Sequence, residues 1–294
     1  MKKLGEFLLA KDVNAIVLAF LCALLPVFSI PTGFVAAIVV GLVTVQKGPK
    51  SGLLLLAWVA LPTVALLVLR QVGQFDILFL RCIIMWILAS LLYRYRAWRL
   101  LLELMAYAGV TLIVILHFCV PHLQQWWVTE LTTYIQQLTA ASHWKIAMKP
   151  AEFAQRLAPF ASGIILFFFL GSVLLELFVA RFWQSLIVSP GTFAKEFVMI
   201  RINSFAAVFL CLLVTLVLLK IRIAEDAFAL AILPFFIAGL SFLHFWVRQN
   251  SKLIVWLILM YVALFFLPAF VVSALAFIAF IDTWRNFRKN KVSI

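Results

Sequence analysis

The sequence predicts an all-α fold: a polytopic transmembrane helical bundle of eight to ten crossings with short amphipathic surface helices. Of its 294 residues, 66% are hydrophobic and only 12% are charged, whereas a soluble domain is about half apolar and about a quarter charged. The apolar runs are continuous over roughly 15 to 30 residues, while the strands of a membrane barrel would alternate in segments of about ten residues. Helices are therefore favoured as the structure that pairs every backbone group within a bilayer.

The basic residues predict a lipid bilayer as the main partner and argue against nucleic-acid binding. The formal net charge is +13, but Lys and Arg lie in short clusters between apolar runs and not on one soluble face. Such clusters are typical of loops on the cytoplasmic side of a membrane. The four cysteines lie in or at the edge of apolar runs without metal-ligand spacing, which favours a role as small packing residues: Cys22, Cys82, Cys119 and Cys211.

The first apolar stretch, 13–46, is too long for one crossing and too short for two full ones, because a span needs ~20 residues. It is either a hairpin or a single long helix, and Pro26 and Pro31 favour a pair of short helices. No small-residue cleavage site follows the basic start, so an uncleaved first span is expected and not a signal peptide. Alanines recur at every fourth residue, a spacing that lets another helix approach closely: Ala15, Ala19 and Ala23.

Two charged residues are expected inside membrane spans. Arg81 lies in a predicted span at 77–93, and Glu176 lies near the end of another at 160–180. A charge at the centre of a bilayer costs about 2.5 to 3.5 kcal/mol on insertion scales, so each is a candidate functional residue. The alternative is a structural ion pair, of Arg81 with Asp76 and of Glu176 with an arginine across the bundle.

Residues 122–159 are predicted to form an extracytoplasmic amphipathic insertion. Trp127, Leu131, Tyr134 and Leu138 recur at helical spacing, and Gln and Thr residues occupy the other positions. A second helix is expected to begin at Pro150, since proline is favoured in the first turn.

The charge distribution predicts a bacterial cytoplasmic-membrane protein with both termini in the cytoplasm, because most Lys and Arg then fall on the cytoplasmic side. The last apolar run, 253–281, contains Pro268 and is again either a hairpin or one long helix. Only a hairpin returns the basic C-terminal tail to the cytoplasm. The whole chain, 1–294, is expected to form a single integral membrane domain.

The segment 181–201 is predicted to form two short interfacial helices on the cytoplasmic side, joined at Ser189-Pro190-Gly191. Ser189 is expected to cap the second helix. Phe193 and Phe197 share one apolar face of that helix. Two interpretations stay open: an elbow that positions the flanking spans, or a docking surface for a membrane or cytoplasmic protein.

The pattern R-x-W-Q…P-G-x-F-x-x-E-F…R in this segment resembles the cytoplasmic loop of the YybS-like family of uncharacterised bacterial multi-pass membrane proteins. That family is distantly similar to the substrate-binding subunits of energy-coupling-factor transporters, whose first helix docks on a coupling subunit through an alanine ladder. The resemblance implies that the three alanines and the segment contact partners. The residues that carry the pattern are Arg181, Trp183, Gln184, Pro190, Gly191, Phe193, Glu196, Phe197 and Arg201.

The sequence favours a carrier-like protein that binds a small ligand among its helices, an expectation that depends on the resemblance. One alternative is a non-enzymatic scaffold that recruits a partner through 181–201. Another is an intramembrane enzyme acting on a lipid-linked substrate. No motif for a catalytic, cofactor-binding or metal site occurs in the sequence, so we expect no enzyme and no cofactor.

Overall fold

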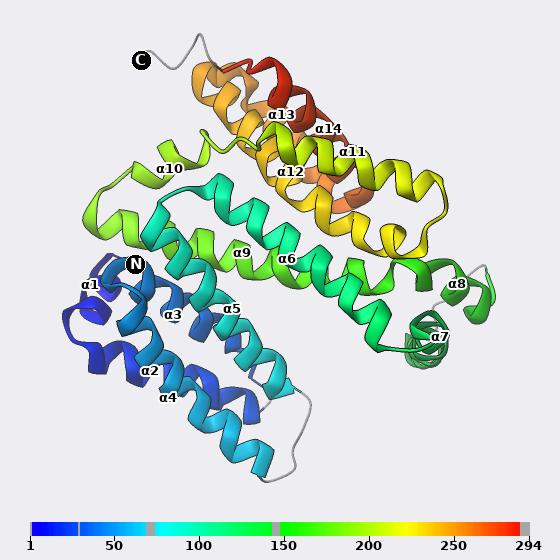
Figure 1. The fold of residues 1–294 in the computed structure, drawn as a ribbon. Helices are drawn as coiled ribbons and strands as arrows, with labels where there is room; N and C mark the ends of the chain where they lie inside the picture. Colours follow the sequence, from blue (N-terminus) through cyan, green and yellow to red (C-terminus); the bar gives the residue numbers. More distant parts are fainter. Residues whose placement is uncertain (1, 29, 69–73, 143–147, 289–294) are drawn as a thin grey trace. The chain divides into compact units, whose positions relative to one another are not determined.

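The computed structural model describes residues 2–28, 30–68, 74–142 and 148–288, and every regular element in these ranges is a helix (Figure 1). The chain folds into two compact units. Two of their boundaries fall inside α6 (Trp98–Cys119) and α9 (Ala161–Val188), and the third follows residue 198. The first unit comprises 1–101 and 170–198, and the second unit comprises 102–169 and 199–294. The sequence predicted one membrane domain, and the helix contacts divide it into these two units.

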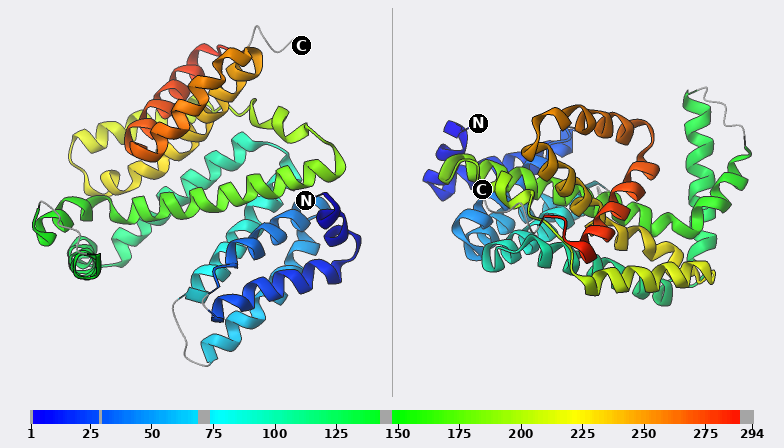
Figure 2. Two further views of the ribbon diagram at one scale, coloured as in Figure 1. Left: turned by 180° about the vertical axis from the view of Figure 1, so that it is seen from behind. Right: turned by 90° about the horizontal axis from the view of Figure 1, so that it is seen from above.

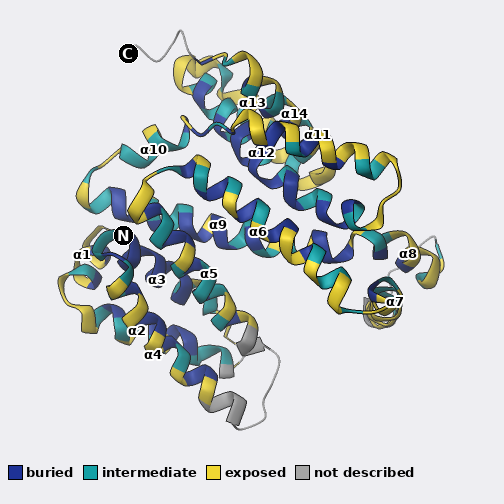
Figure 3. Ribbon diagram, viewed as in Figure 1, coloured by how far each residue is buried: buried dark blue, intermediate teal, exposed yellow. Residues whose placement is uncertain are grey.

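The first unit is built on four helices that pack against one another: α2 (Asp12–Leu24), α3 (Gly33–Lys47), α4 (Pro49–Val68) and α5 (Gln74–Tyr95). They lie side by side in Figures 1 and 2. Helix α1 (Lys2–Ala10) precedes them, and the later part of α9 (Ala161–Val188) belongs to the same unit. Most of α3 is buried (Figure 3), because its β-branched and small residues are apolar on every face.

The three alanines at every fourth residue, which we call the alanine ladder, pack inside the first unit. Ala15, Ala19 and Ala23 are each 0% exposed, and α2 packs against α3 and α4. Small side chains let these helix backbones approach closely. The face predicted to dock on a partner is therefore covered by the chain's own helices.

The second unit is centred on α12 (Arg222–Gln249), which packs against α14 (Pro268–Arg285), α11 (Ser204–Leu218) and α13 (Ile254–Phe266). Gly239 permits a close approach of α12 to α14, since a Cβ there would overlap the carbonyl oxygen of Leu275 in α14. The greater part of α6 (Trp98–Cys119), helices α7 (Leu123–Ser142) and α8 (Pro150–Leu157), the short 3-10 turn Ala158–Phe160 and the start of α9 belong to this unit too.

Within the described residues, five helical stretches are long and apolar enough to cross a membrane: 77–95, 98–119, 150–188, 222–249 and 268–285. The pair α1 and α2 would make a sixth if they form one span, although they bend by 110°. The eight to ten predicted crossings are not confirmed, because the other apolar stretches are 10–17 residues long over the residues searched, less than the ~20 residues of a full span. These are 33–47, 49–64, 204–218 and 251–266.

Both ambiguous terminal stretches fold as pairs of helices and not as single long ones. The first is divided into α2 and α3, with a 3-10 turn at Leu25–Phe28 after α2. The second is divided at Leu267 into α13 and α14, and Pro268 occupies the first turn of α14. The two helices of each pair contact each other.

The polar insertion forms helices α7 and α8, and α8 begins at Pro150 as predicted. The buried face of α7 differs from the predicted one. Leu123 and Ile135 are buried, whereas Tyr134 is 61% exposed and Leu138 is 38% exposed. Trp127, which belongs to the predicted face, is held toward α9, since its Nε1 donates a hydrogen bond to Ser162 Oγ at 2.8 Å.

Candidate functional site

The segment that carries the motif forms a helix end, a turn and a short helix. Helix α9 continues without a break to Val188, and α10 spans Thr192–Phe197. The turn between them is Ser189-Pro190-Gly191, as predicted. Ser189 is not the N-cap, however: Gly191 occupies that position with φ of 85°, a conformation that glycine adopts without strain.

The aromatic residues of this segment pack into the first unit. The ring of Phe193 lies 6.0 Å from that of Phe178 and 6.2 Å from that of Trp98. Phe197 lies 5.5 Å from Phe178, and Trp183 is only 7% exposed in a core shared with α1 and α3. The exposed aromatic patch required for a scaffold is therefore absent from these described residues.

The polar residues of the motif form a continuous hydrogen-bond network. Arg181 donates hydrogen bonds to both carboxylate oxygens of Glu196 and to the amide oxygen of Gln184. Gln184 in turn donates to Gln46 at 2.7 Å, and Trp98 donates to Glu196 at 3.2 Å. The network fixes α10 against the ends of α3 and α9.

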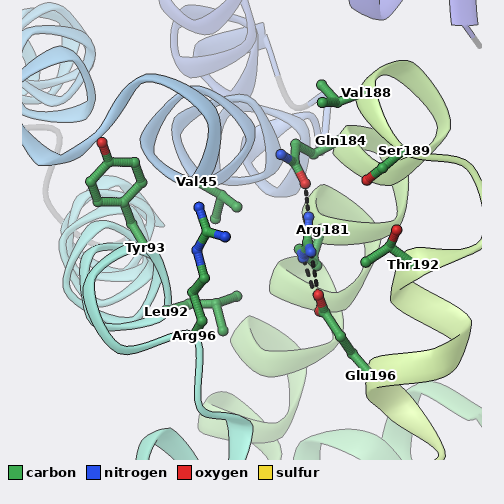
Figure 4. Close-up of a pocket in the computed structure, with 10 residues that line it drawn as sticks. All are labelled: Val45, Leu92, Tyr93, Arg96, Arg181, Gln184, Val188, Ser189, Thr192 and Glu196. Atoms are coloured by element: carbon green, nitrogen blue, oxygen red, sulfur yellow. Dashed lines mark hydrogen bonds and ion pairs between the residues drawn. The ribbon is translucent and has the colours of Figure 1, made fainter.

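A cavity of about 240 Å³ lies beside this network (Figure 4). We call it the arginine pocket. Its apolar wall includes Val45 and Leu92, and its polar lining includes Arg96, Ser189 and Thr192 in addition to the Arg181 network. The pocket gathers the C-terminal ends of α3, α5 and α9 around α10.

Arg96 is the charged residue of this pocket that does not belong to the sequence motif. It lies in the break between α5 and α6 with φ of 48°. Such a conformation costs a non-glycine residue about 1–2 kcal/mol, and strain of this kind is concentrated at functional sites. The sequence offers no signal for it, because Arg96 is one of three arginines in an ordinary basic cluster.

The two intramembrane charges pair with each other. Arg81 in α5 forms an ion pair with Glu176 in α9, and it donates to Ser172 at 3.0 Å. The prediction that Glu176 pairs with an arginine across the bundle is confirmed, while the side chain of Asp76 lies outside the described residues. Neither residue lines the arginine pocket, and the ion pair joins α5 to α9 within the first unit.

Arg201 belongs to the second unit and takes part in a different cluster. Its guanidinium contacts Asp282, with Nε 3.3 Å from the carboxylate and Nη2 donating to the backbone oxygen at 2.7 Å. Arg288 lies 3.2 Å from the same carboxylate and is 2% exposed. Burial lowers the pKa of Arg288 to about 10, opposed by Asp282, so the guanidinium stays charged at neutral pH.

A second cavity, of about 230 Å³, lies in the second unit, and we call it the histidine pocket. His117 Nε2 is 3.1 Å from Asp226 Oδ2, and the backbone N–H of Gly163 donates to Asp226 Oδ1 at 2.6 Å. Asp226 is 2% exposed. His122 and Arg222 also line this cavity. The pocket gathers the C-terminal end of α6, the residues before α9 and the first turn of α12.

Within the described residues, no group of three His, Cys, Asp or Glu side chains is placed to hold a metal ion. The fold defines the class: an all-helical protein with several helices suited to a lipid bilayer. Comparisons with protein-family models, with curated proteins and with solved structures find no match.

Proposed function

We propose that this chain is a carrier-like multi-pass protein of the bacterial cytoplasmic membrane, which binds a small ligand in the arginine pocket. The observation that carries the proposal is a cavity among helix ends into which several polar groups converge, since ligand sites combine apolar walls with a few placed polar groups. The cavity is below the range of about 300–1,000 Å³ typical of drug-sized ligands, so the ligand is a small molecule or a small part of a larger one.

The residues that line the two pockets support helices that cross the membrane in alternating directions, and the basic residues then favour both termini in the cytoplasm. If α2–α6, α9 and α11–α14 all cross the membrane, the ends of α3, α5 and α9 that form the arginine pocket are cytoplasmic. The end of α6 and the starts of α9 and α12, which form the histidine pocket, are then on the opposite side. All the helix ends that form one pocket would thus lie on the same side of the membrane, as the positive-inside rule assigns them. The short helices α3, α11 and α13 would cross where the bilayer is locally thin.

The scaffold alternative has less support. A docking surface needs exposed anchor residues, typically aromatic side chains and arginine. Trp183 is buried, Phe193 and Phe197 pack on aromatic rings of their own unit, and Arg181 is paired. A relation to the YybS-like family, with docking on a coupling subunit, would require a surface other than the alanine ladder.

The histidine pocket supports a second candidate function, an intramembrane enzyme on a lipid-linked substrate. Asp226 can hold His117 in the tautomer whose Nε2–H faces the carboxylate, which leaves Nδ1 able to accept a proton. The variant Asp226→Asn keeps an acceptor for Gly163 and removes the charge. If this function is correct, cells that carry only Asp226→Asn accumulate the same lipid as cells that lack the protein; unchanged lipid profiles in both would rule it out.

The carrier proposal is tested by mass spectrometry of small molecules that co-purify with the full chain. We expect one species at constant stoichiometry with the wild type and its loss in Arg96→Gly, which removes the guanidinium but suits the backbone conformation. Arg94→Ala is the matched control. It also removes a positive charge, and Arg94 is less than one helical turn from Arg96 but does not line the pocket. Identical spectra for all three proteins would exclude this pocket as the ligand site.

A further inference from the structure

We infer that the arginine pocket binds a phosphate ester, an inference that rests on the proposed function and names the chemical class of its ligand. The inference depends on the polar groups that line the cavity and on which of them already have a hydrogen-bond or ion-pair partner in the protein. Two sources share this chemistry: the headgroup of an anionic phospholipid and a water-soluble phosphate ester.

The charges that line the pocket favour an anion. Arg181 and Glu196 compensate each other: each guanidinium nitrogen of Arg181 donates to an acceptor in the protein, and both carboxylate oxygens of Glu196 accept a hydrogen bond. Arg96 is the remaining charged residue of the lining. Its guanidinium has no ion pair or hydrogen bond within the described part of the chain. An anionic ligand would supply the missing partner.

The neutral donors favour phosphate over a carboxylate. The hydroxyls of Ser189 and Thr192 line the same cavity, and neither has a side-chain hydrogen-bond partner among the described residues. Figure 4 shows them on the α9–α10 side, while Arg96 enters from the end of α5. Donors that converge from different elements suit a tetrahedral phosphate, which has several acceptor oxygens. A planar carboxylate would be satisfied by two parallel N–H groups of one arginine alone.

The apolar wall of the pocket fits the remainder of such a ligand. Val45, Leu92 and Val188 line the cavity next to the polar groups, and Val188 is 54% exposed. Tyr93 lies next to Gly48, where an added Cβ would come within 3.2 Å of the phenol ring, and it points its hydroxyl away from Arg181 (Figure 4). A phosphate among the donors with a short glycerol or alkyl segment against these side chains would occupy the whole cavity.

The test uses the purified full chain and three water-soluble probes: inorganic phosphate, glycerol 3-phosphate and acetate. Isothermal titration calorimetry measures their binding, and native mass spectrometry measures retention of phosphatidylglycerol from mixed lipid nanodiscs. We expect at least one phosphate probe to bind the wild type and Arg94→Ala alike, and to bind Arg96→Gly about tenfold or more weakly. The double variant Ser189→Ala/Thr192→Val should weaken phosphate binding further relative to acetate.

The two sources give different results. Retention of phosphatidylglycerol without binding of the soluble probes assigns the site to a lipid headgroup, and the reverse assigns it to a soluble ester. Acetate binding as tight as that of phosphate, or phosphate binding unchanged in Arg96→Gly, would overturn the inference. If Arg96→Gly releases a co-purified molecule that contains no phosphate, the inference is wrong while the proposed function stands; if it releases nothing and no probe binds, both fail.

Discussion

Arg96 combines an unfavourable backbone conformation with the free charge of the arginine pocket. It follows α5 in the position where glycine is the usual residue at the end of a helix. Among the residues that the structure describes, four non-glycine residues have positive φ, and two of these, Arg96 and His122, line the two cavities. At both positions a side chain is present where the backbone alone would favour glycine, as expected if the side chain has a function.

A first prediction concerns this conformation. In the absence of ligand, Arg96→Gly should raise the free energy of unfolding by about 0.5–1 kcal/mol, since glycine adopts positive φ without strain. Arg94→Gly, inside the last turn of α5, should lower it by about 0.8–1 kcal/mol. Thermal unfolding in detergent measures both; a loss of stability in Arg96→Gly would show that the guanidinium serves the fold.

A second prediction concerns the cluster around Asp282. Asp282→Ala leaves the buried Arg288 without its carboxylate and should cost about 3–5 kcal/mol. The double variant Asp282→Ala/Arg288→Met should be more stable than Asp282→Ala alone, because no buried charge is left uncompensated. Chemical denaturation of the three proteins gives the order of stability. Additive losses in the double variant would contradict this account.

At the scale of the elements, close helix contacts depend on small residues whose role is not visible in the sequence. Gly163 brings α9 against α12, and a Cβ there would overlap the carbonyl oxygen of Asp226. The same contact lets the Gly163 N–H bond the Asp226 carboxylate. One glycine therefore determines both the packing of two helices and the geometry of the histidine pocket.

A third prediction follows from this contact. Gly-to-Ala in a helix normally stabilises by about 1 kcal/mol, but Gly163→Ala should destabilise by about 1–3 kcal/mol through overpacking. Gly33→Ala is the control, because its new methyl would meet only the flexible end of Leu78. The midpoints of thermal unfolding should fall for the first variant and change little for the second. Equal effects would show that α9 and α12 are not in such close contact.

A fourth prediction concerns the alanine ladder. Ala19→Leu should destabilise the protein by about 1–3 kcal/mol, since Ala19 is fully buried against its own helices. Val17→Leu, at a position 51% exposed, should be nearly neutral. Unfolding of the purified chain without a partner measures the difference. A stable Ala19→Leu protein that instead loses a co-purifying partner would restore the docking interpretation.

For the whole molecule, the helix lengths and the pockets give different numbers of crossings. Five described stretches are long and apolar enough to cross a membrane, or six with the bent pair. If α3 and α4 do not cross, the end of α3 lies on the opposite side of the membrane from the end of α5, although Val45 and Leu92 line the same pocket. Ten crossings would place both helix ends on one side.

A fifth prediction separates these counts. In a cysteine-free background, a membrane-impermeant thiol reagent applied to intact cells should label Lys149→Cys and not Lys195→Cys. If α3 crosses, Pro31→Cys is labelled and Lys50→Cys is protected until the membrane is opened. All four positions are exposed to solvent or lipid in the structure. Labelling of Lys195→Cys in intact cells would reverse the orientation.

Much of the secondary structure was predictable, because apolar runs, prolines and the Ser189-Pro190-Gly191 turn act locally along the chain. The break at Pro268, the start of α8 at Pro150 and the end of α9 near Val188 all follow from such signals. The Ser189 cap was wrong, because the helix begins after Gly191 adopts a left-handed conformation. The predicted face of α7 was right at Trp127, which bonds Ser162 of α9, and wrong at Tyr134 and Leu138, which are exposed while Ile135 is buried. Periodicity alone does not identify the neighbour that a helix packs against.

The sequence by itself determined that this chain is helical, apolar enough for a bilayer and biased in its basic residues, since these properties depend on composition and local order. Only the tertiary structure decided that Arg81 pairs with Glu176, that the alanine ladder is covered, and that Arg96 lines a cavity with Ser189 and Thr192. It also brought His117 to Asp226, 109 positions later in the chain. The physical reason is that a site depends on which helix ends come together in space, and that is a property of packing.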